Sequence, residues 1–189
     1  KCDWSSDVCS SDLIQATIEL ARLADSLGFH RYWLAEHHAL AALADPCPEI
    51  LLARIGAETR YMRVGTGGIL LPHYSALKVA EVFRMLEALY PGRIDLGLGR
   101  TPGGDRRTAH ALREDGFADA DRFPVQVTDL RGHLKADLPA DHRYAGTRVQ
   151  PHGENAPPIW LLGSSDYSGA LAAHLATHFA YAHFINPHG

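Results

Sequence analysis

Three polar clusters contain the side chains that could do chemistry, and the first of them is Glu36-His37-His38. An imidazole titrates near neutral pH, so either histidine could act as a general base while the carboxylate orients it. The alternative is that both are ordinary loop histidines in a chain that contains 12. Their side chains diverge on an extended segment, and the sequence has no HExxH or paired-cysteine pattern, so no metal site is predicted.

The other two clusters, Arg100 and Gly163-Ser164-Ser165, could bind a phosphate group. The glycine and the serines stand just before a predicted helix, where free N–H groups, the helix dipole and two hydroxyls favour an anion. Arg100 could add a bidentate cation. The spacing alone favours a plainer interpretation, in which one serine caps the helix and Arg100 is a surface residue.

Each cluster follows a short apolar run that is typical of a buried strand. We predict five strands, at residues 30–34, 63–66, 93–98, 159–162 and 178–184. Helical spacing of apolar residues, with capping and terminating residues, predicts helices at 14–27, 48–59, between Ser75 and Pro91, at 121–138 and at 166–176. Two segments without strong periodicity, 101–120 and 139–158, are predicted loops.

The alternation of strands and helices predicts an α/β fold with a parallel sheet. In such folds the functional groups lie at the carboxyl ends of the strands, so the polar clusters should meet on one rim. Strands that start near residues 30, 63 and 93 have the spacing of a barrel, although an open doubly wound sheet is the alternative. The residues that follow the five strands are Glu36-His37-His38, Gly67-Gly68, Gly99-Arg100, Gly163-Ser164-Ser165 and His183.

Composition excludes several function classes. The 189 residues are 46% apolar and 21% charged, which is typical of one soluble globular domain. A net charge of −4 disfavours nucleic acid and anionic membranes as partners, and no membrane span or signal peptide is predicted. Residues 3–13, DWSSDVCSSDL, resemble a translated sequencing adapter rather than a domain, with a disordered tail as the alternative. Without residues 1–13 only Cys47 remains, which fits a reducing cytoplasm.

Longer strings carry a resemblance to a known family. RYWLAEHH at 31–38, VGTGGILLPHYSALKVAEVFRMLEALYPGRIDLGLGR at 64–100 and PPIWLLGSS at 157–165 resemble the bacterial-luciferase-like, flavin-dependent monooxygenases. The resemblance implies a (β/α)₈ barrel that binds FMN. It also implies that residues 14–189 are a partial barrel domain, lacking the first strand and the last two βα units.

The resemblance assigns roles to individual residues. His37 occupies the position of the catalytic histidine, and Arg100 that of an arginine on the flavin phosphate. Gly67-Gly68 coincides with a strand end that carries a cis peptide bond beside the flavin ring in relatives. The implied cofactor-binding residues are Glu36, Gly67, Gly68, Arg100, Leu162, Gly163, Ser164, Ser165 and, as a weaker match, Ser168.

The implied reaction uses reduced FMN and O₂ to oxygenate a small organic substrate, with His37 assisting proton transfer. The implied partners are a flavin reductase, with NAD(P)H as the indirect electron donor, and a second copy of the chain in a homodimer. We expect the intact parent protein, rather than this fragment, to be active. The alternatives are an oxidoreductase of the same superfamily that uses the deazaflavin F420, and a non-catalytic barrel subunit.

Overall fold

The computed structural model describes residues 10–40, 42–101, 103–113 and 120–187. Its centre is a parallel sheet in the order β1-β2-β4-β5-β6, with the short strand β3 also paired to β4. The α/β class and the parallel pairing predicted from the sequence are confirmed. The strands are β1 Arg31–Leu34, β2 Arg63–Thr66, β3 Ile69–Leu70, β4 Ile94–Gly99, β5 Ile159–Gly163 and β6 His178–Tyr181.

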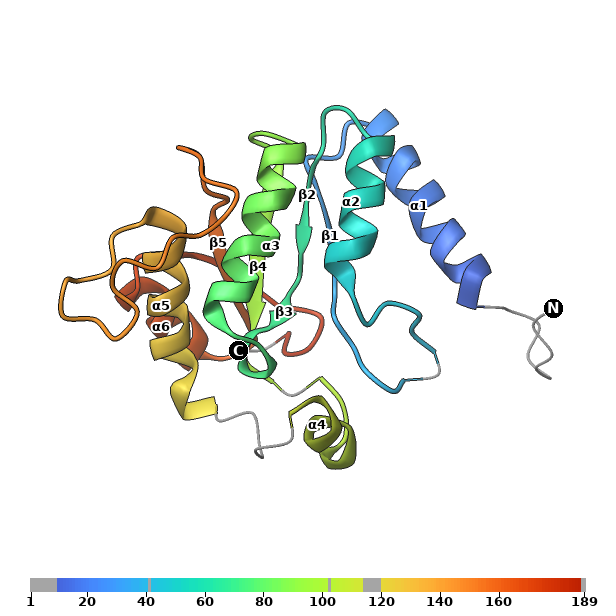
Figure 1. The fold of residues 1–189 in the computed structure, drawn as a ribbon. Helices are drawn as coiled ribbons and strands as arrows, with labels where there is room; N and C mark the ends of the chain where they lie inside the picture. Colours follow the sequence, from blue (N-terminus) through green and yellow to red (C-terminus); the bar gives the residue numbers. More distant parts are fainter. Residues whose placement is uncertain (1–9, 41, 102, 114–119, 188–189) are drawn as a thin grey trace.

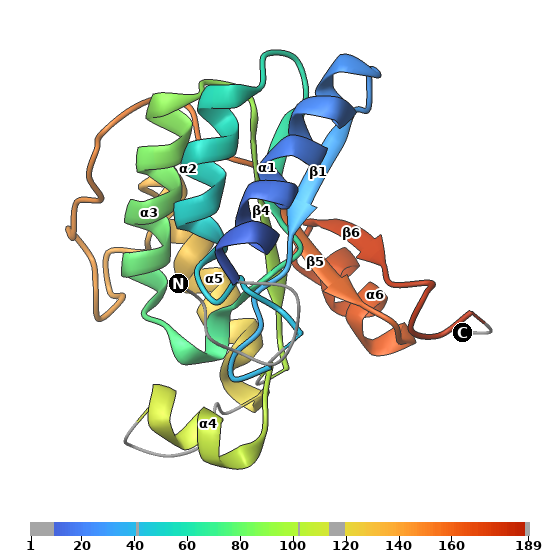
Figure 2. The same cartoon turned by 90° about the vertical axis from the view of Figure 1, so that its right-hand side faces the viewer.

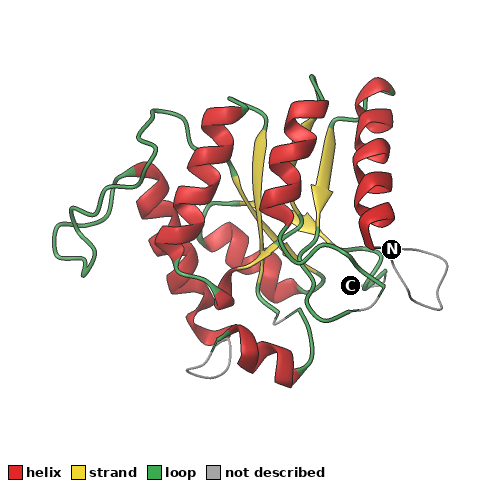
Figure 3. Cartoon of the chain, turned by 45° about the vertical axis from the view of Figure 1, so that its right-hand side comes forward, coloured by secondary structure: helices red, strands yellow, loops and turns green. Residues whose placement is uncertain are grey.

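Helices follow the strands and pack on one face of the sheet. Helices α1, α2, α3 and α5 form a row beside the strands, and α6 packs against β5 and β6 (Figures 1, 2 and 3). This one-sided layer is the wall of a half-barrel. The helices are α1 Ser10–Ser26, α2 Pro48–Glu58, α3 Ala76–Leu89, α4 Arg106–Leu112, α5 Phe123–Lys135 and α6 Asp166–His174, with 3₁₀ turns at Leu71–His73 and Ala120–Arg122.

The core lies between the sheet and the helix row, because alternate residues of each strand point to opposite faces. Leu96 and Leu98 of β4 are fully buried and belong to one apolar cluster with Leu52, Phe83 and helix α5. Burial of such side chains is the main force that holds the helices on the sheet. Among the described residues, no helix is both long enough and apolar enough to span a membrane.

The opposite face of the strands carries polar and aromatic residues near their amino ends. The Asp95 carboxylate is fully buried and pairs with Arg31 at 3.0 Å and Arg63 at 2.7 Å. It also accepts a hydrogen bond of 3.1 Å from Nε1 of Trp33. Trp33 in turn contacts the edge of Trp160, so these groups tie β1, β2, β4 and β5 together. A buried carboxylate is tolerated here because two guanidinium groups and an indole N–H satisfy it.

The ends of the predicted elements agree well with the structure where local signals are strong. Ser75 caps α3, and its hydroxyl accepts a 3.5 Å hydrogen bond from the N–H of Lys78. Pro48 lies in the first turn of α2. Strand β2 has the predicted bounds, and α3 ends before Pro91 as predicted.

Several predicted elements differ from the structure in detail. The predicted loop 101–120 contains α4, a short polar helix that Asp105 caps and that buries only Ala109, so it has no apolar stripe to detect. The first helix begins at Ser10 rather than at residue 14, inside the segment set aside as an adapter, while residues 1–9 lie outside the described part. The predicted helix 121–138 and strand 178–184 are shorter, and β3 was not predicted.

Candidate active site

The carboxyl ends of the strands meet at one edge of the sheet, as the sequence predicts. The parallel register aligns Leu34 with Thr66, Leu70 with Gly99, and Leu98 with Leu161. The loop after β1 and helix α4 after β4 both lie at the lower edge in Figure 1. The clusters that follow the strands therefore share one rim.

Glu36 is buried beneath this rim and is fully engaged by protein groups. Its Oε1 accepts hydrogen bonds from Nε2 of His38 at 2.6 Å and from the hydroxyl of Tyr74 at 2.7 Å. Its Oε2 accepts the backbone N–H of Leu70 at 2.8 Å. Burial raises the pKa of Tyr74, and the hydrogen bond to Glu36 raises it further, so the phenol stays protonated and donates. The structure thus shows three protein partners on the Glu36 carboxylate, and its contact with a cofactor stays a prediction.

His37 differs from both of its neighbours. It is half-buried, whereas Glu36 and His38 are buried, and its backbone N–H donates to the carbonyl of Asp45 at 3.4 Å. No side-chain hydrogen bond to the His37 imidazole occurs within the described part of the chain. The neighbours hold the backbone, and the His37 ring remains free to interact with a ligand.

The Asp45 carboxylate lies in the same acidic surroundings. Burial raises its pKa, the N–H of Cys47 lowers it, and Glu49 and Glu36 raise it again, with a net increase. Asp45 and Tyr74 are not among the residues predicted from the sequence. No local pattern distinguishes them, because their contacts with the Glu36–His38 segment depend on the tertiary fold.

Gly67 and Gly68 join β2 to β3 through a cis peptide bond, at the position where the resemblance implies one. A Cβ atom on Gly67 would lie 3.2 Å from Cβ of Trp33, and one on Gly68 would lie 2.8 Å from Cδ1 of Leu162. The structure therefore brings together three of the predicted cofactor residues, Gly67, Gly68 and Leu162. Any side chain at either glycine would crowd this surface.

The phosphate-binding candidates gather at the start of α6. Ser165 is the N-cap residue, yet its side chain makes no capping hydrogen bond, and its Oγ lies 3.4 Å from Oγ of Ser168 instead. A Cβ atom on Gly163 would overlap the Ser168 side chain. The guanidinium of Arg100 lies over the ring of Tyr167, 4.6 Å from its centroid, in the first turn of the same helix. Arg100 and the serines are thus on one side of the rim.

His183 is exposed beyond the end of β6, with its ring 6.4 Å from that of Tyr181. Among the described residues, no three His, Cys, Asp or Glu side chains gather closely enough to hold a metal ion.

Almost the whole chain matches a known protein family. The family model of luciferase-like monooxygenases matches residues 5–188. The chain belongs to the luciferase-like monooxygenase family. The resemblance drawn from the three sequence strings is therefore confirmed.

Relatives in this family are similar over almost the whole chain. YceB of Bacillus subtilis is 48% identical over 174 residues, which are 92% of this chain and 53% of YceB. N-acetyl-S-alkylcysteine monooxygenase of the same organism is 42% identical over 177 residues, 94% of this chain and 53% of the enzyme. The crystal structure of apo-MsnO8 superposes with a TM-score of 0.89 at 48% identity and covers 96% of this chain and 53% of that one. The chain spans about half the length of these relatives.

More distant solved structures share the fold. The oxygenating constituent of 3,6-diketocamphane monooxygenase from Pseudomonas putida, in complex with FMN, has a TM-score of 0.70 at 20% identity and covers 93% of this chain and 54% of its own. An F420-dependent secondary alcohol dehydrogenase has a TM-score of 0.69 at 17% identity, and the match covers 84% of this chain and 51% of the dehydrogenase. Both flavin and deazaflavin enzymes therefore use this fold.

Proposed function

We propose that the protein is the oxygenase of an FMN-dependent monooxygenase system, which uses reduced FMN and O₂ to oxygenate a small organic substrate. The observation that carries the proposal is the arrangement at the start of α6. Arg100 lies against the first helical turn, and Ser165 leaves its capping position unused. A helix N-terminus, two hydroxyls and a guanidinium together suit a phosphate group.

The described residues fit a flavin at a second place as well. Gly67, Gly68 and Leu162 lie together beside the carboxyl ends of β2 and β5, and the two glycines carry no side chain. The flat ring of the flavin is proposed to lie against these residues, with the phosphate directed to Gly163, Ser164, Ser165 and Ser168. When bound, reduced FMN supplies the electrons that activate O₂.

The chain's own side chains then have separate roles. Arg100 and the serines bind the phosphate, whereas His37 holds or releases a proton at its imidazole. Glu36 and His38 position His37, because Glu36 is bonded to His38 and Tyr74 while His37 has no side-chain partner among the described residues. A flavin reductase that uses NAD(P)H is the proposed partner, since the FMN-bound relative is named as an oxygenating constituent. The proposal keeps the predicted homodimer and cytoplasmic location.

The test is a titration of the chain with FMN, in which the change in flavin fluorescence measures binding. A parallel titration uses F420. We expect Arg100→Gln to weaken FMN binding tenfold or more, on the order of one charge-assisted hydrogen bond. The matched control is Arg107→Gln, an exposed arginine on α4. Equal FMN affinity in Arg100→Gln and the wild type would reject the phosphate site, and tighter binding of F420 would favour the deazaflavin alternative.

Catalysis is tested on the intact parent protein with reduced FMN and O₂. His37→Gln should lose turnover while FMN affinity stays unchanged. A loss of both would mean that His37 serves binding, and unchanged turnover would return it to the ordinary loop histidines.

A further inference from the structure

The loop after β4 and the short helix α4 lie at the rim, beyond the carboxyl ends of the strands (Figure 1). The proposed function uses only Arg100 from this segment. Helix α4 buries a single side chain, that of Ala109, so apolar packing does little to hold the segment in place. Its contacts are instead with the part of the chain that carries His37.

One end of the segment is fixed to the residue that follows His37. The backbone N–H of His38 donates to the carbonyl of Gly103 at 3.2 Å, and the N–H of His37 donates to the carbonyl of Asp45 at 3.4 Å. The bond to Asp45 lies within the loop after β1. The bond to Gly103, in contrast, ties that loop to the loop after β4.

Gly103 has a conformation and surroundings that require a glycine. Its φ is +65°, in the left-handed region that residues with a Cβ atom rarely adopt. A Cβ atom on Gly103 would overlap Cδ1 of Leu70 and would lie 3.6 Å from the carbonyl oxygen of Glu36. The N–H of Leu70 donates to the Glu36 carboxylate at 2.8 Å. Gly103 therefore packs against both partners of this hydrogen bond.

Gly104 makes a second close approach to the same loop. A Cβ atom on Gly104 would lie 3.2 Å from the carbonyl oxygen of His38, which is tighter than most real Cβ contacts. An alanine at this position would push the His38 carbonyl away by a few tenths of an ångström. The two successive glycines thus leave just enough room for the backbone of the Glu36–His38 segment.

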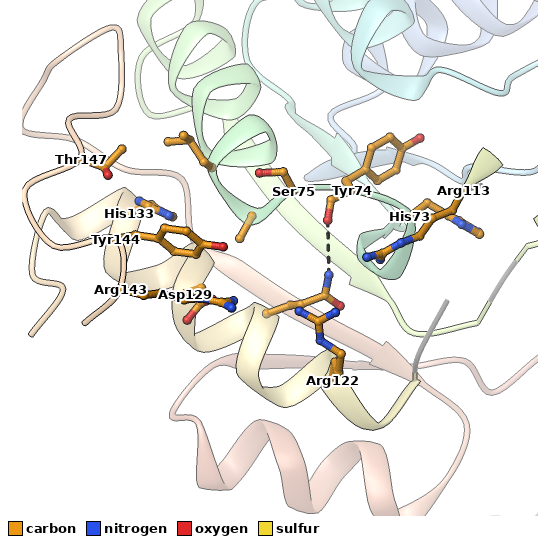
Figure 4. A pocket seen from close by; sticks show the side chains of 13 residues that line it. His73, Tyr74, Ser75, Arg113, Arg122, Asp129, His133, Arg143, Tyr144 and Thr147 are labelled. Carbon is orange, nitrogen blue, oxygen red and sulfur yellow. Dashed lines mark hydrogen bonds and ion pairs between the residues drawn. The ribbon is translucent and has the colours of Figure 1, made fainter. Parts of the chain in front are cut away.

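The far end of α4 is fixed as well. Arg113 follows this helix and donates from Nη1 to the carbonyl of Pro72 at 2.7 Å. Figure 4 shows Arg113 and His73 next to each other. The following residue, Tyr74, donates its hydroxyl to Glu36. The segment from Gly103 to Arg113 is therefore joined to two parts of the hydrogen-bond network around Glu36.

We propose that the Gly103-Gly104 turn is a positioning element for the His37 imidazole. The Gly103 carbonyl holds the backbone of His38 and Glu36 holds its side chain, so the residue next to His37 is fixed at two points. The His37 ring has no side-chain partner among the described residues, so its direction depends on this backbone. A displacement of the turn therefore moves the imidazole.

The consequence for turnover rests on the proposed function, in which His37 holds or releases a proton. The position of the His37 ring does not rest on it. The two parts of the inference are therefore tested separately, first on the ring and then on turnover.

The first test measures the NMR signals of the His37 ring in the 189-residue chain without flavin. The signals are identified by their loss in His37→Gln. We expect Gly103→Ala to shift them most, Gly104→Ala to shift them less, and Gly146→Ala to leave them unchanged. Gly146 is the matched control, because its φ of +77° is also left-handed while a Cβ atom there would meet nothing within 4 Å.

Circular dichroism shows which variants remain folded. If Gly103→Ala unfolds, Gly104→Ala decides the test, because its Cβ atom needs only a small movement of the His38 carbonyl. Unchanged His37 signals in every folded variant at Gly103 and Gly104 would overturn the proposal. An equal shift in Gly146→Ala would overturn it too, because backbone strain alone would then explain the shift.

The second test measures turnover and FMN affinity of the intact parent protein. Gly104→Ala should lower kcat roughly tenfold, since misplacing a catalytic group by about 1 Å can cost a hundredfold. FMN affinity should stay unchanged, and a parallel loss of both would contradict a role through His37. If His37→Gln keeps full turnover, the proposed catalytic role of His37 fails, while the NMR signals still decide whether the turn positions its ring.

Discussion

The hydroxyl of Tyr74 lies 2.7 Å from Oε1 of Glu36, so a residue just before α3 satisfies a buried carboxylate in the loop after β1. Nε2 of His38 contacts the same oxygen at 2.6 Å. Because Glu36 and His38 flank His37, this network determines where the candidate catalytic imidazole lies.

Tyr74→Phe should destabilise the chain by about 1.5–3 kcal/mol, the range for a hydrogen bond to a charged group. The phenyl ring still fills the space, so the loss is that of the hydroxyl alone. Urea denaturation measures the change in the free energy of unfolding. The matched control is Tyr61→Phe, because Tyr61 is 85% exposed. Equal stability of the two variants would contradict the role assigned to Tyr74.

Asp25→Asn should lower stability at neutral pH and flatten its decline in acid. The Asp25 carboxylate accepts the N–H groups of Arg60, Tyr61 and Met62 at 2.7–3.0 Å. Burial raises its pKa, but these hydrogen bonds outweigh burial and the net pKa is lowered. A lowered carboxyl pKa gives stability that is present above the unfolded value and lost as pH falls through the folded one.

The Asp25 experiment measures the free energy of unfolding from pH 6 down to pH 3. Wild type should lose more stability below about pH 4 than Asp25→Asn does. Asp141→Asn, at an exposed aspartate, should follow the wild-type profile. Parallel profiles for Asp25→Asn and the wild type would show that the three backbone hydrogen bonds to Asp25 contribute nothing.

Gly97→Ala should be strongly destabilising, by about 3 kcal/mol or more. A Cβ atom on this central residue of β4 would overlap the backbone carbonyl of Thr66, which cannot move without breaking the sheet. Gly169→Ala is the matched control, because its Cβ atom would lie 3.6 Å from the ring of Phe179 in β6, an ordinary van der Waals contact. We expect that control to be neutral or stabilising in thermal unfolding. If Gly97→Ala changed stability only slightly, β2 and β4 would have to lie further apart than the structure places them.

His133 should make stability fall as the pH drops through the range of free histidine. Burial lowers its folded pKa below the unfolded value of about 6.5, so the folded state resists protonation. Stability is therefore full above that value and declines as pH falls towards the folded pKa. His133→Gln should show a smaller decline between pH 7.5 and 5.5 in urea titrations, whereas His174→Gln, at an exposed histidine, should not. An unchanged slope in His133→Gln would reject this linkage.

Local signals in the sequence predicted the elements that they directly encode. Ser75 and Pro91 bracket α3, Pro48 marks the start of α2, and the segment 63–66 before Gly67-Gly68 is β2. Helix α4 was missed because a seven-residue polar helix with one buried residue has no apolar period. Its cap, Asp105, was the only local sign of it.

The rim was predictable for a topological reason. In a parallel sheet every strand ends at the same edge, so the placement of the Glu36–His38 segment, Gly67-Gly68, Arg100 and Gly163 followed from the strand assignments. The resemblance to luciferase-like monooxygenases covered the same positions. Neither source indicated that Glu36 would be buried, since its partner Tyr74 is 38 residues away in the sequence.

By itself, the sequence determined the α/β class, most of the element bounds, the family and the edge where polar groups gather, because these depend on local periodicity and on matched strings. Only the tertiary structure decided which of the rim residues face outward. It buried Glu36 and His38, left the His37 ring without a side-chain partner among the described residues, and packed Gly103 against the Glu36–His38 segment. Such outcomes depend on contacts between segments far apart in the chain, and their free energies come from burial and hydrogen-bond geometry that no local pattern encodes.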